Sequence, residues 1–444
     1  MPGQPHWFLT HHSVAIVTDL LVMWFVLSLL RQRSRPAGSA IAWLLAVAFI
    51  PYLGIPLYLM IGGRKLSRRA GRKERISLPT RALGLGTPST IAELTWLDDG
   101  VLAFDTFIAQ IAGAQHSIRI VSFVLGDDAT GHALIDALIE RARAGLEVRL
   151  LLDDLLRFHA PKAKLRELVR AGARVERFMP LLHVPFRGHG NLRNHRKIAL
   201  FDGQRAIVGG MNLAHEYMGP TPEPTRWRDL SLLVSGEAAP ALDAVFRADW
   251  AFACGERLSP AARVEPGPIP VRVVPSGPDA DSDPIYDADL TALFRAEKRI
   301  WIATPYFVPD EALLRALMIA VRRGVDVRVV TPSRSNHLLS DLASESCLRD
   351  LKAEGVNIAC FDHMLHAKAL LVDDSLAVVG SANFDMRSLF LNYEIALFFS
   401  GAQEVERLAR WFEHTLRSTR PGPEKRGVVR GAVGDVLRLL SPLL

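Results

Sequence analysis

An internal repeat constrains the fold of this chain more than any other feature of its sequence. The pattern His-x-Lys-x-x-x-x-Asp occurs twice, once in NHRKIALFDG around His195 and once in LHAKALLVDD around His366. Each copy is followed at the same distance by a turn of small residues and an asparagine, in GGMN and in GSAN. Two histidines and two lysines supplied by a repeat predict one site built from two halves. That combination suits chemistry on a phosphodiester.

The segments around the repeat predict an α/β fold with two similar lobes. Each half begins with an apolar strand, at 117–126 and 299–308, and continues with a segment of helical periodicity, at 133–145 and 312–324. A glycine ends each predicted helix, and a second strand follows at once. The predicted divisions are an N-terminal membrane anchor at 1–63, a polar stretch at about 64–95, a first lobe at 96–255, a Pro- and Gly-rich linker at 256–269, a second lobe at 270–420 and a C-terminal tail at 421–444.

Each copy of the repeated pattern is expected to begin a β-hairpin. His195 and Lys197 are two residues apart, so on extended backbone both side chains face the same way, and the same holds for His366 and Lys368. The Asp of each copy falls at the hairpin turn, where it can cap backbone N–H groups or take part in the site, and both roles stay open. The candidate catalytic residues are His195, Lys197, Asp202, His366, Lys368 and Asp373.

Further polar residues of the repeat are candidates for binding or orienting. Asp229 opens DLSLLVSG and Glu394 opens EIALFFSG, so the repeat places one carboxylate at an equivalent position in each half. A carboxylate there can accept a hydrogen bond from a ring N–H of a catalytic histidine and fix its tautomer. Glu223 is the alternative in the first half, and a solvated strand end is the plainer interpretation of both carboxylates. The full set is Asn212, Ser381, Asn383, Asp229 and Glu394.

The N-terminus carries two apolar runs, at 14–30 and 40–61. A spanning helix needs ~20 apolar residues, whereas the first run is slightly short and contains Asp19, and the second contains two prolines. Basic segments flank the second run on both sides, which favours a membrane hairpin over a pair of buried core helices. The heavier positive charge follows the second run, so we expect the lobes on the cytoplasmic side, although three arginines lie between the runs. The tail GAVGDVLRLLSPLL is predicted to be an amphipathic helix on the membrane or a packed terminal helix.

Composition limits the partners and cofactors. A net charge of +6 favours an anionic partner, and both nucleic acid and anionic lipid fit. The three cysteines show no paired spacing, which predicts reduced structural thiols. The sequence contains no zinc-protease, EF-hand or CxxC pattern and therefore demands no metal or other cofactor. The two lysines can neutralise phosphate charge instead.

The repeated pattern resembles the signature of the phospholipase D superfamily. From about residue 40 to the C-terminus, longer strings are similar to the bacterial cardiolipin synthase family, among them NLRNHRKIALFDGQRAIVGGMNLAHEYMG, TRWRDLSL, ATPYFVPDEALLRAL and VGSANFDMRSLFLNYE. Val121 and Phe123 depart from the family, in which many members carry Glu and Tyr at these positions. The resemblance implies two α/β lobes that share one active site, preceded by a membrane hairpin in the bacterial inner membrane.

The resemblance also implies a reaction. A phosphatidyl group would pass from one phosphatidylglycerol to another through a covalent phosphatidyl-histidine, giving cardiolipin and glycerol. It assigns the nucleophile to His195 and the acid–base role to His366, an assignment that the residues alone leave open. The alternatives are a membrane phospholipase D or phosphatidyltransferase with water or another alcohol as acceptor, a nuclease, and a non-catalytic membrane scaffold. The membrane anchor argues against nucleic acid as a partner, and intact motifs in both halves argue against a scaffold.

Overall fold

The computed structural model describes residues 86–155, 160–180, 191–280 and 282–423, together with the isolated positions 43–45, 47, 49, 54 and 434. Apart from those positions, the predicted membrane runs, the basic segments around them and the C-terminal tail from residue 424 lie outside the described residues. Among the helices that are described, none combines the length and the apolar character needed to cross a bilayer.

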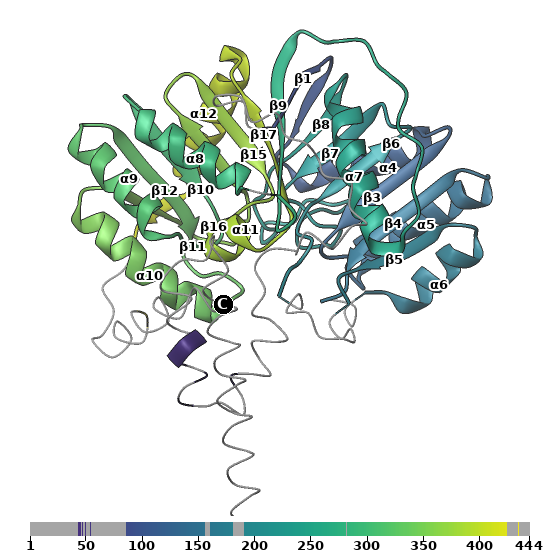
Figure 1. Ribbon diagram of the computed structural model, residues 1–444, viewed down its shortest axis with the longest axis horizontal. Helices are drawn as coiled ribbons and strands as arrows, with labels where there is room; N and C mark the ends of the chain where they lie inside the picture. Colours follow the sequence, from purple (N-terminus) through teal and green to yellow (C-terminus); the bar gives the residue numbers. More distant parts are fainter. Residues whose placement is uncertain are drawn as a thin grey trace, which may run out of the picture.

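The first lobe is built on a seven-stranded mixed sheet. Its elements are β2 (Leu94–Leu97), α4 (Gly100–Gly113), β3 (Ser117–Ser122), α5 (Ala129–Arg143), β4 (Glu147–Asp153), α6 (Lys162–Arg170), β5 (Arg174–Phe178), β6 (Ile198–Phe201), β7 (Arg205–Gly209), β8 (Ser231–Ser235) and α7 (Ala238–Cys254). The strand order is β2-β8-β7-β6-β3-β4-β5, and only the β3, β4 and β5 pairings are parallel. Helices α4, α5 and α6 pack on one face of this sheet, as Figure 1 shows.

The second lobe repeats this topology in a nine-stranded sheet. Its elements are β9 (Ile269–Ser276), α8 (Pro284–Arg295), β10 (Arg299–Ala303), β11 (Phe307–Val308), α9 (Glu311–Arg322), β12 (Asp326–Pro332), α10 (Leu338–Ala353), β13 (Asn357–Phe361), β14 (Ala369–Val372), β15 (Leu376–Gly380), β16 (Phe384–Asp385), α11 (Met386–Phe390), β17 (Glu394–Phe399), α12 (Ala402–Leu416) and β18 (Thr419–Pro421). Within it the order β9-β17-β15-β14-β10-β12-β13 matches, strand for strand, the whole sheet of the first lobe. Both lobes are therefore α/β, as the repeat predicted.

Local signals explain why the repeated helices begin and end where they do. The Asp128 side chain accepts the N–H of Gly131 (2.8 Å) and caps α5, and Asp310 caps α9 in the same way. Gly145 follows α5 with φ +90°, and Gly324 follows α9 with φ +87°. Only glycine adopts this left-handed conformation without cost, so each chain segment can turn directly into the next strand.

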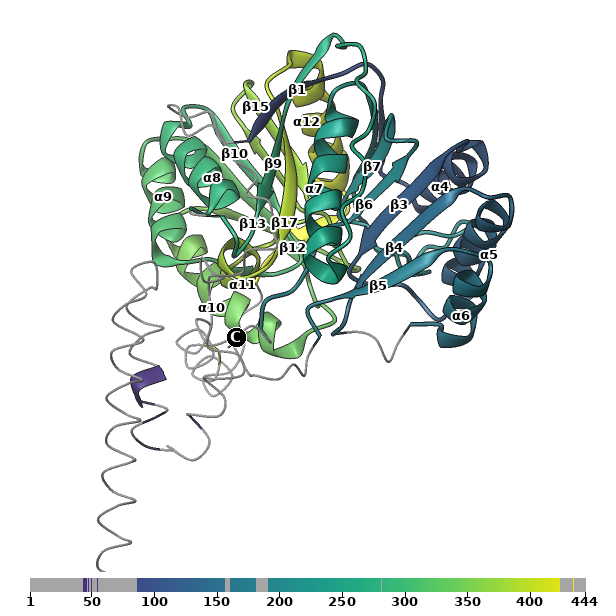
Figure 2. The ribbon, with the colours of Figure 1, turned by 45° about the vertical axis from the view of Figure 1, so that its right-hand side comes forward.

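The main hydrophobic core lies between the two sheets. Helices α7 and α12 occupy this space, where α7 packs against strands of both lobes (Figure 2). Trp250 of α7 and Trp411 of α12 are almost completely buried there, with 0% and 1% exposure. Because one core joins both sheets, the lobes form a single body, and the residues at the ends of their facing strands are held in register.

One strand departs from the sequence prediction. Residues up to about 95 were expected to form a polar stretch, but β1 (Thr87–Ile91) joins the sheet of the second lobe, antiparallel to β9. Two residues later β2 enters the sheet of the first lobe. Ile91 is fully buried in the shared core. This segment therefore fastens the two lobes together before the repeat begins.

Candidate active site

The two histidine segments meet at the interface between the lobes. The backbone N–H of His195 donates to the carbonyl of Tyr393 (2.9 Å), and that of His366 donates to the carbonyl of Arg228 (2.7 Å). In each case the residue before the histidine forms a parallel bridge with the residue before the predicted carboxylate of the other lobe. The backbone thus brings each histidine beside a carboxylate from the opposite half.

Each predicted orienting carboxylate contacts the histidine of the opposite lobe. Nδ1 of His195 lies 3.0 Å from Oε1 of Glu394, and Nδ1 of His366 lies 2.6 Å from Oδ2 of Asp229. A carboxylate that accepts the Nδ1–H leaves Nε2 with its lone pair, ready to react. Glu223, the alternative in the first half, contacts neighbouring side chains of its own exposed loop instead.

Burial and nearby positive charge favour the neutral form of both rings. Burial lowers the pKa of His195, although Glu394 opposes the shift. Burial also lowers the pKa of His366 to about 3, and the charge of Lys368 acts in the same direction against the opposing Asp229. Burial alone would raise the pKa of Asp229 and that of Glu394. The histidine that bonds to each carboxylate and the lysine near it instead bring this pKa below its usual range. The site therefore holds neutral imidazoles beside ionised carboxylates.

The two lysines supply positive charge in a region nearly closed to water. Nζ of Lys197 donates to the carbonyl of His195 (2.7 Å). Nζ of Lys368 donates to the carbonyl of His366 and lies 2.7 Å from Nδ1 and 3.1 Å from Nε2 of that ring. Burial lowers the pKa of Lys368 to about 8 and that of Lys197 well below its ordinary value. An anionic phosphodiester is the kind of ligand that would restore both charges.

The three predicted binding residues all lie close to the histidines. Oδ1 of Asn212 accepts a backbone N–H just after β3 (3.2 Å). Ser381 donates through Oγ to Glu394, and its carbonyl lies 3.2 Å from Nδ1 of His195. Asn383 differs, because its buried Oδ1 is one of the side-chain atoms of the described structure without a hydrogen-bond partner. An unpaired buried acceptor beside a cavity is suited to a donor on the substrate.

A cavity of about 490 Å³ lies between the lobes, with both histidines in its wall. Its polar part contains His195, His366, Asn212 and Asn383. The rest of the wall combines apolar side chains, among them Phe123, Val124, Leu155, Val308, Leu339 and Met386, with further polar ones, namely Tyr306, Asn336, His337, Ser340, Asp385, Arg387, Ser388 and Asn392. A volume of this size accommodates a single small ligand or lipid headgroup, held by a few placed polar groups.

Three aromatic rings pack against the histidines, and the sequence did not predict their roles. The ring of Phe123 meets that of His195 edge-on at 5.0 Å between centroids. Tyr217 and Trp227 contact the ring of His366 at 5.0 and 5.5 Å. These contacts exclude water from one side of each imidazole and so contribute to the lowered histidine pKa values. The sequence singled out Phe123 only as a departure from the family, and Tyr217 and Trp227 stood without a role inside strings that carry the family resemblance.

A fully buried ion pair inside the first repeated pattern was also missed. Nη1 of Arg196 lies 2.7 Å from both carboxylate oxygens of Asp249 on α7. The same guanidinium donates across the interface to the carbonyls of Glu394 and Ser276, each at 3.0 Å. The second pattern has Ala367 at the equivalent position. The ion pair therefore braces only the half of the site that contains His195.

Asp202 and Asp373 lie at the hairpin turns, seven residues from their histidines. The Asp202 carboxylate accepts backbone N–H groups of residues 115–117 at 2.7 to 2.9 Å, and Asp373 accepts those of 297–299 at 2.7 to 3.1 Å. Seven residues of extended chain span about 20 Å, so neither carboxylate is near the histidines. We therefore propose a structural role for both residues in place of the catalytic one that was expected.

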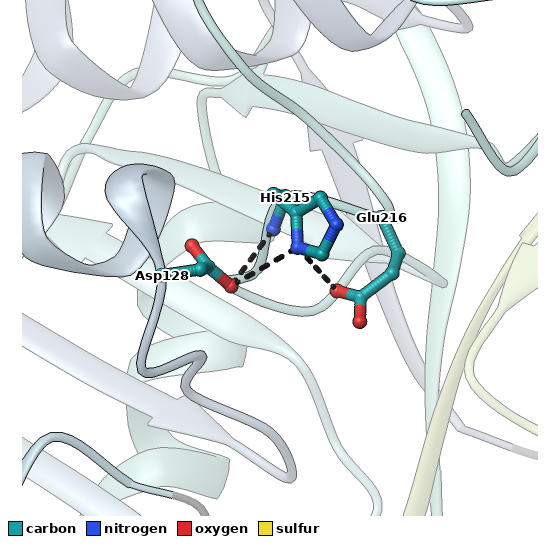
Figure 3. Close-up of side chains that lie close together, drawn as sticks. All are labelled: Asp128, His215 and Glu216. Carbon is teal, nitrogen blue, oxygen red and sulfur yellow. Dashed lines mark hydrogen bonds and ion pairs between the residues drawn. The ribbon is translucent and has the colours of Figure 1, made fainter. Parts of the chain in front are cut away.

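One group of side chains outside the cavity has donors spaced for a metal ion. Among the described residues, Asp128, His215 and Glu216 form this group, with Nδ1 of His215 3.4 Å from each carboxylate (Figure 3). Both Asp128 oxygens already accept backbone N–H groups, from Gly131 at 2.8 Å and from His215 at 3.1 Å. Helix capping and loop attachment account for this geometry, and the chemistry proposed below does not use it.

Two α/β lobes that each contribute a His–Lys pair to one interface define a protein of the phospholipase D class. Among solved structures, a phosphatidylserine synthase from Haemophilus influenzae Rd KW20 shares this fold with a TM-score of 0.62 at 15% identity, covering 81% of this chain and 96% of that one. A polyphosphate kinase from Porphyromonas gingivalis has a TM-score of 0.52 at 13% identity, covering 83% and 55%. These similarities concern the fold alone.

Sequence comparisons narrow the class to one family. Residues 107–250 and 290–416 match the family described as cardiolipin synthase, PLD-like domain, and residues 20–63 match the phospholipase D-nuclease N-terminal family. A cardiolipin synthase of Geobacillus thermodenitrificans (strain NG80-2) is 33% identical over 97% of this chain and 93% of its own length. Cardiolipin synthase 1 of Bacillus anthracis is 32% identical over 93% and 90%. The chain belongs to the cardiolipin synthase family.

Proposed function

We propose that the chain transfers a phosphatidyl group from one phosphatidylglycerol to the headgroup hydroxyl of another, giving cardiolipin and glycerol. The observation that carries this proposal is the pair of buried histidines in one cavity, each with its Nδ1 against a carboxylate of the opposite lobe. Such a pair can divide a displacement at phosphorus into two steps through a covalent intermediate. One phosphodiester is exchanged for another, so the reaction needs no nucleotide.

In the first step Nε2 of His195 attacks phosphorus, and the bond to the glycerol oxygen breaks. The neutral imidazole has the lone pair for this attack, and Glu394 stabilises the positive charge that develops on the ring. The anionic phosphate offsets the lysine charges that disfavour a protonated His366. That ring can then take up a proton and donate it to the leaving glycerol.

In the second step the acceptor hydroxyl gives its proton to His366, and its oxygen attacks phosphorus. The bond from phosphorus to Nε2 of His195 breaks, and cardiolipin is released. Lys197 and Lys368 neutralise the phosphate oxygens in both steps, and Oδ1 of Asn383 is placed to accept a hydrogen bond from a glycerol hydroxyl. These two reaction steps require no metal ion.

The cellular setting forms part of the same proposal. We place the chain in the bacterial inner membrane, with 1–63 as anchor and the lobes at 96–255 and 270–420 on the cytoplasmic side. The family match over residues 20–63, the two apolar runs and the charge that follows them support this placement. The substrates are anionic phospholipids, and nucleic acid is not expected to bind productively.

The test is product analysis by mass spectrometry with phosphatidylglycerol in detergent micelles. Cardiolipin and glycerol are expected from the wild-type chain, and neither from His195→Ala. Phosphatidic acid without cardiolipin would instead identify water as the acceptor. With an activated leaving group, His366→Ala should accumulate the adduct on His195, because loss of the base slows its turnover more than its formation. An adduct found on His366 in the wild-type chain would reverse the assignment of the two histidines.

A further inference from the structure

The opening of the cavity carries exposed apolar side chains from both lobes. Leu155 follows β4 of the first lobe and is 39% exposed. Leu339 lies at the start of α10 in the second lobe and is 54% exposed. Both residues line the cavity. Leu338, next to the lining, is 61% exposed. Single exposed leucines are ordinary on protein surfaces. These three gather at the opening that leads to the histidines.

The cavity is too small to hold whole phospholipid substrates. At about 490 Å³ the cavity matches a site for one small ligand, whereas the proposed reaction joins two phospholipids that carry four acyl chains between them. The phosphate and headgroups can reach the histidines, but most of each acyl chain has to remain outside. Long apolar chains outside the protein are stable only in a bilayer or a comparable apolar phase.

On the second-lobe side of the opening, Leu338 and Leu339 follow a segment that carries a positive charge and is held by hydrogen bonds. Arg334 is exposed a few residues before Leu338. The N–H of Ser335 donates to the carboxylate of Asp341 (3.1 Å), and the Tyr306 hydroxyl donates to Oδ1 of Asn336 (2.5 Å). The segment is therefore fixed in place. A cation beside apolar side chains suits a surface with anionic headgroups above an acyl layer.

Residues of the second N-terminal apolar run lie on the same side of the molecule. Leu45 and Phe49 are 51% and 79% exposed. The described piece at 43–45 lies on the side of the lobes where α10 is found, in both views (Figures 1 and 2). A second part of the chain with exposed apolar side chains thus lies on the same side of the lobes as α10, the helix that carries Leu338 and Leu339.

We propose that the rim of the cavity, formed by Leu155, Arg334, Leu338 and Leu339, rests on the surface of an anionic bilayer. The leucines enter the boundary between headgroups and acyl chains, and Arg334 contacts the anionic headgroups. Substrate phosphates then reach the histidines while the acyl chains stay in the bilayer. This inference rests on the proposed function and adds to it the surface through which the substrates enter.

The experiment compares two forms of phosphatidylglycerol, namely vesicles of long-chain lipid and a dihexanoyl form dissolved as monomers. In full-length protein, Leu338→Asp is expected to lower cardiolipin formation from vesicles about tenfold, because an ionised side chain resists burial in the acyl layer. Its activity on the monomeric substrate should stay at the wild-type value. Ile319→Asp is the matched control, since Ile319 lies on α9, is 41% exposed and is away from the cavity. This control should change neither activity.

Each other outcome has a defined meaning. Wild-type activity of Leu338→Asp on vesicles, or an equal loss on both substrates, would overturn the inference and leave the proposed function intact. A wild-type chain that makes no cardiolipin from either substrate would instead refute the proposed function. A second measurement does not depend on catalysis. A polarity-sensitive dye on Leu338→Cys, in a Cys254→Ser background, should be quenched by spin-labelled lipids, and the same dye on Ile319→Cys should not.

Discussion

At the scale of single residues, burial controls the charge of the site. Among the histidines and lysines of the repeated patterns, Lys368 has a pKa of about 8, close to neutral pH. Its ammonium is present below that pH and is lost as the pH rises through it, since burial disfavours the charged form. The consequence is that phosphate neutralisation weakens in mildly alkaline solution, where an exposed lysine would still be fully charged.

This gives a prediction about the pH profile. The rate constant kcat/KM on monomeric phosphatidylglycerol should fall as the pH rises through about 8. Lys368→Arg keeps its charge above that pH, so any activity that it retains should have its alkaline limb shifted upward by at least about one pH unit. An unchanged alkaline limb in this variant would show that another group is responsible.

A second residue-scale prediction concerns Asp289, a buried side chain of α8 that the mechanism does not use. Burial raises its pKa to about 8, and its Oδ1 has no hydrogen-bond partner. The folded chain therefore holds a proton that the unfolded chain releases near pH 4. The contribution of Asp289 to the free energy of unfolding is therefore largest below about pH 4, and it declines as the pH rises from about 4 to about 8.

Asp289→Asn removes that titration and so tests it. The variant should unfold at nearly the same temperature as the wild-type chain at pH 5, and a few degrees higher at pH 8.5. Thermal unfolding in detergent, followed by circular dichroism at both pH values, makes the comparison. A difference between the two proteins that does not change with pH would contradict an ionisable group at this position.

At the scale of helices and strands, the sequence predicted the elements whose positions are set by residues close to them in the chain. Helices α5 and α9 and both hairpins follow from local periodicity, capping residues and glycines, so their positions were found within a few residues. Strand β1 was missed because its partner is remote. Thr87 pairs with Val273, and nothing in the polar segment around Thr87 signals that pairing.

The hairpin turns provide the prediction at this scale. Asn at position 202 tolerates the left-handed φ of 54° but offers one carbonyl oxygen and no charge to the three N–H groups that Asp202 now caps. Asp202→Asn should lower the free energy of unfolding by about 1 kcal/mol. Its kcat should stay within about twofold of wild type, since the carboxylate is remote from the histidines.

The matched comparison is His195→Ala, which should behave in the opposite way, with activity lost and stability nearly kept. Urea unfolding and steady-state kinetics on the same preparations separate the two effects. Loss of activity in fully folded Asp202→Asn protein would return Asp202 to the catalytic set.

At the scale of the whole molecule, the two lobes complete each other. The repeat identified the histidines and an equivalent carboxylate in each half, but not which carboxylate serves which histidine. That pairing depends on how the lobes face one another, with His195 against Glu394 and His366 against Asp229. The contact between Arg196 and Asp249, both in the first lobe, was hidden because the two residues are far apart in sequence and meet only in the folded core.

The ion pair lies within the first lobe, and removing both of its members allows the contacts of Arg196 across the interface to be tested apart from the chemistry. Arg196→Met alone leaves the Asp249 carboxylate buried without its cation, which should destabilise the protein by about 3–5 kcal/mol. Adding Asp249→Leu removes both charges and should restore most of the stability. The double variant still lacks the donors to the carbonyls of Glu394 and Ser276, so Glu394 is held less firmly against His195.

The expected result for the double variant is near wild-type unfolding with kcat lowered about tenfold and KM little changed, because the positioning of the nucleophile His195 affects the transition state more than substrate binding. Covalent adduct formation with an activated leaving group should slow by the same factor, since that step uses His195. Turnover of the adduct by His366, which has no equivalent arginine, should slow less. Full recovery of both steps in the double variant would mean that the ion pair only fills the core.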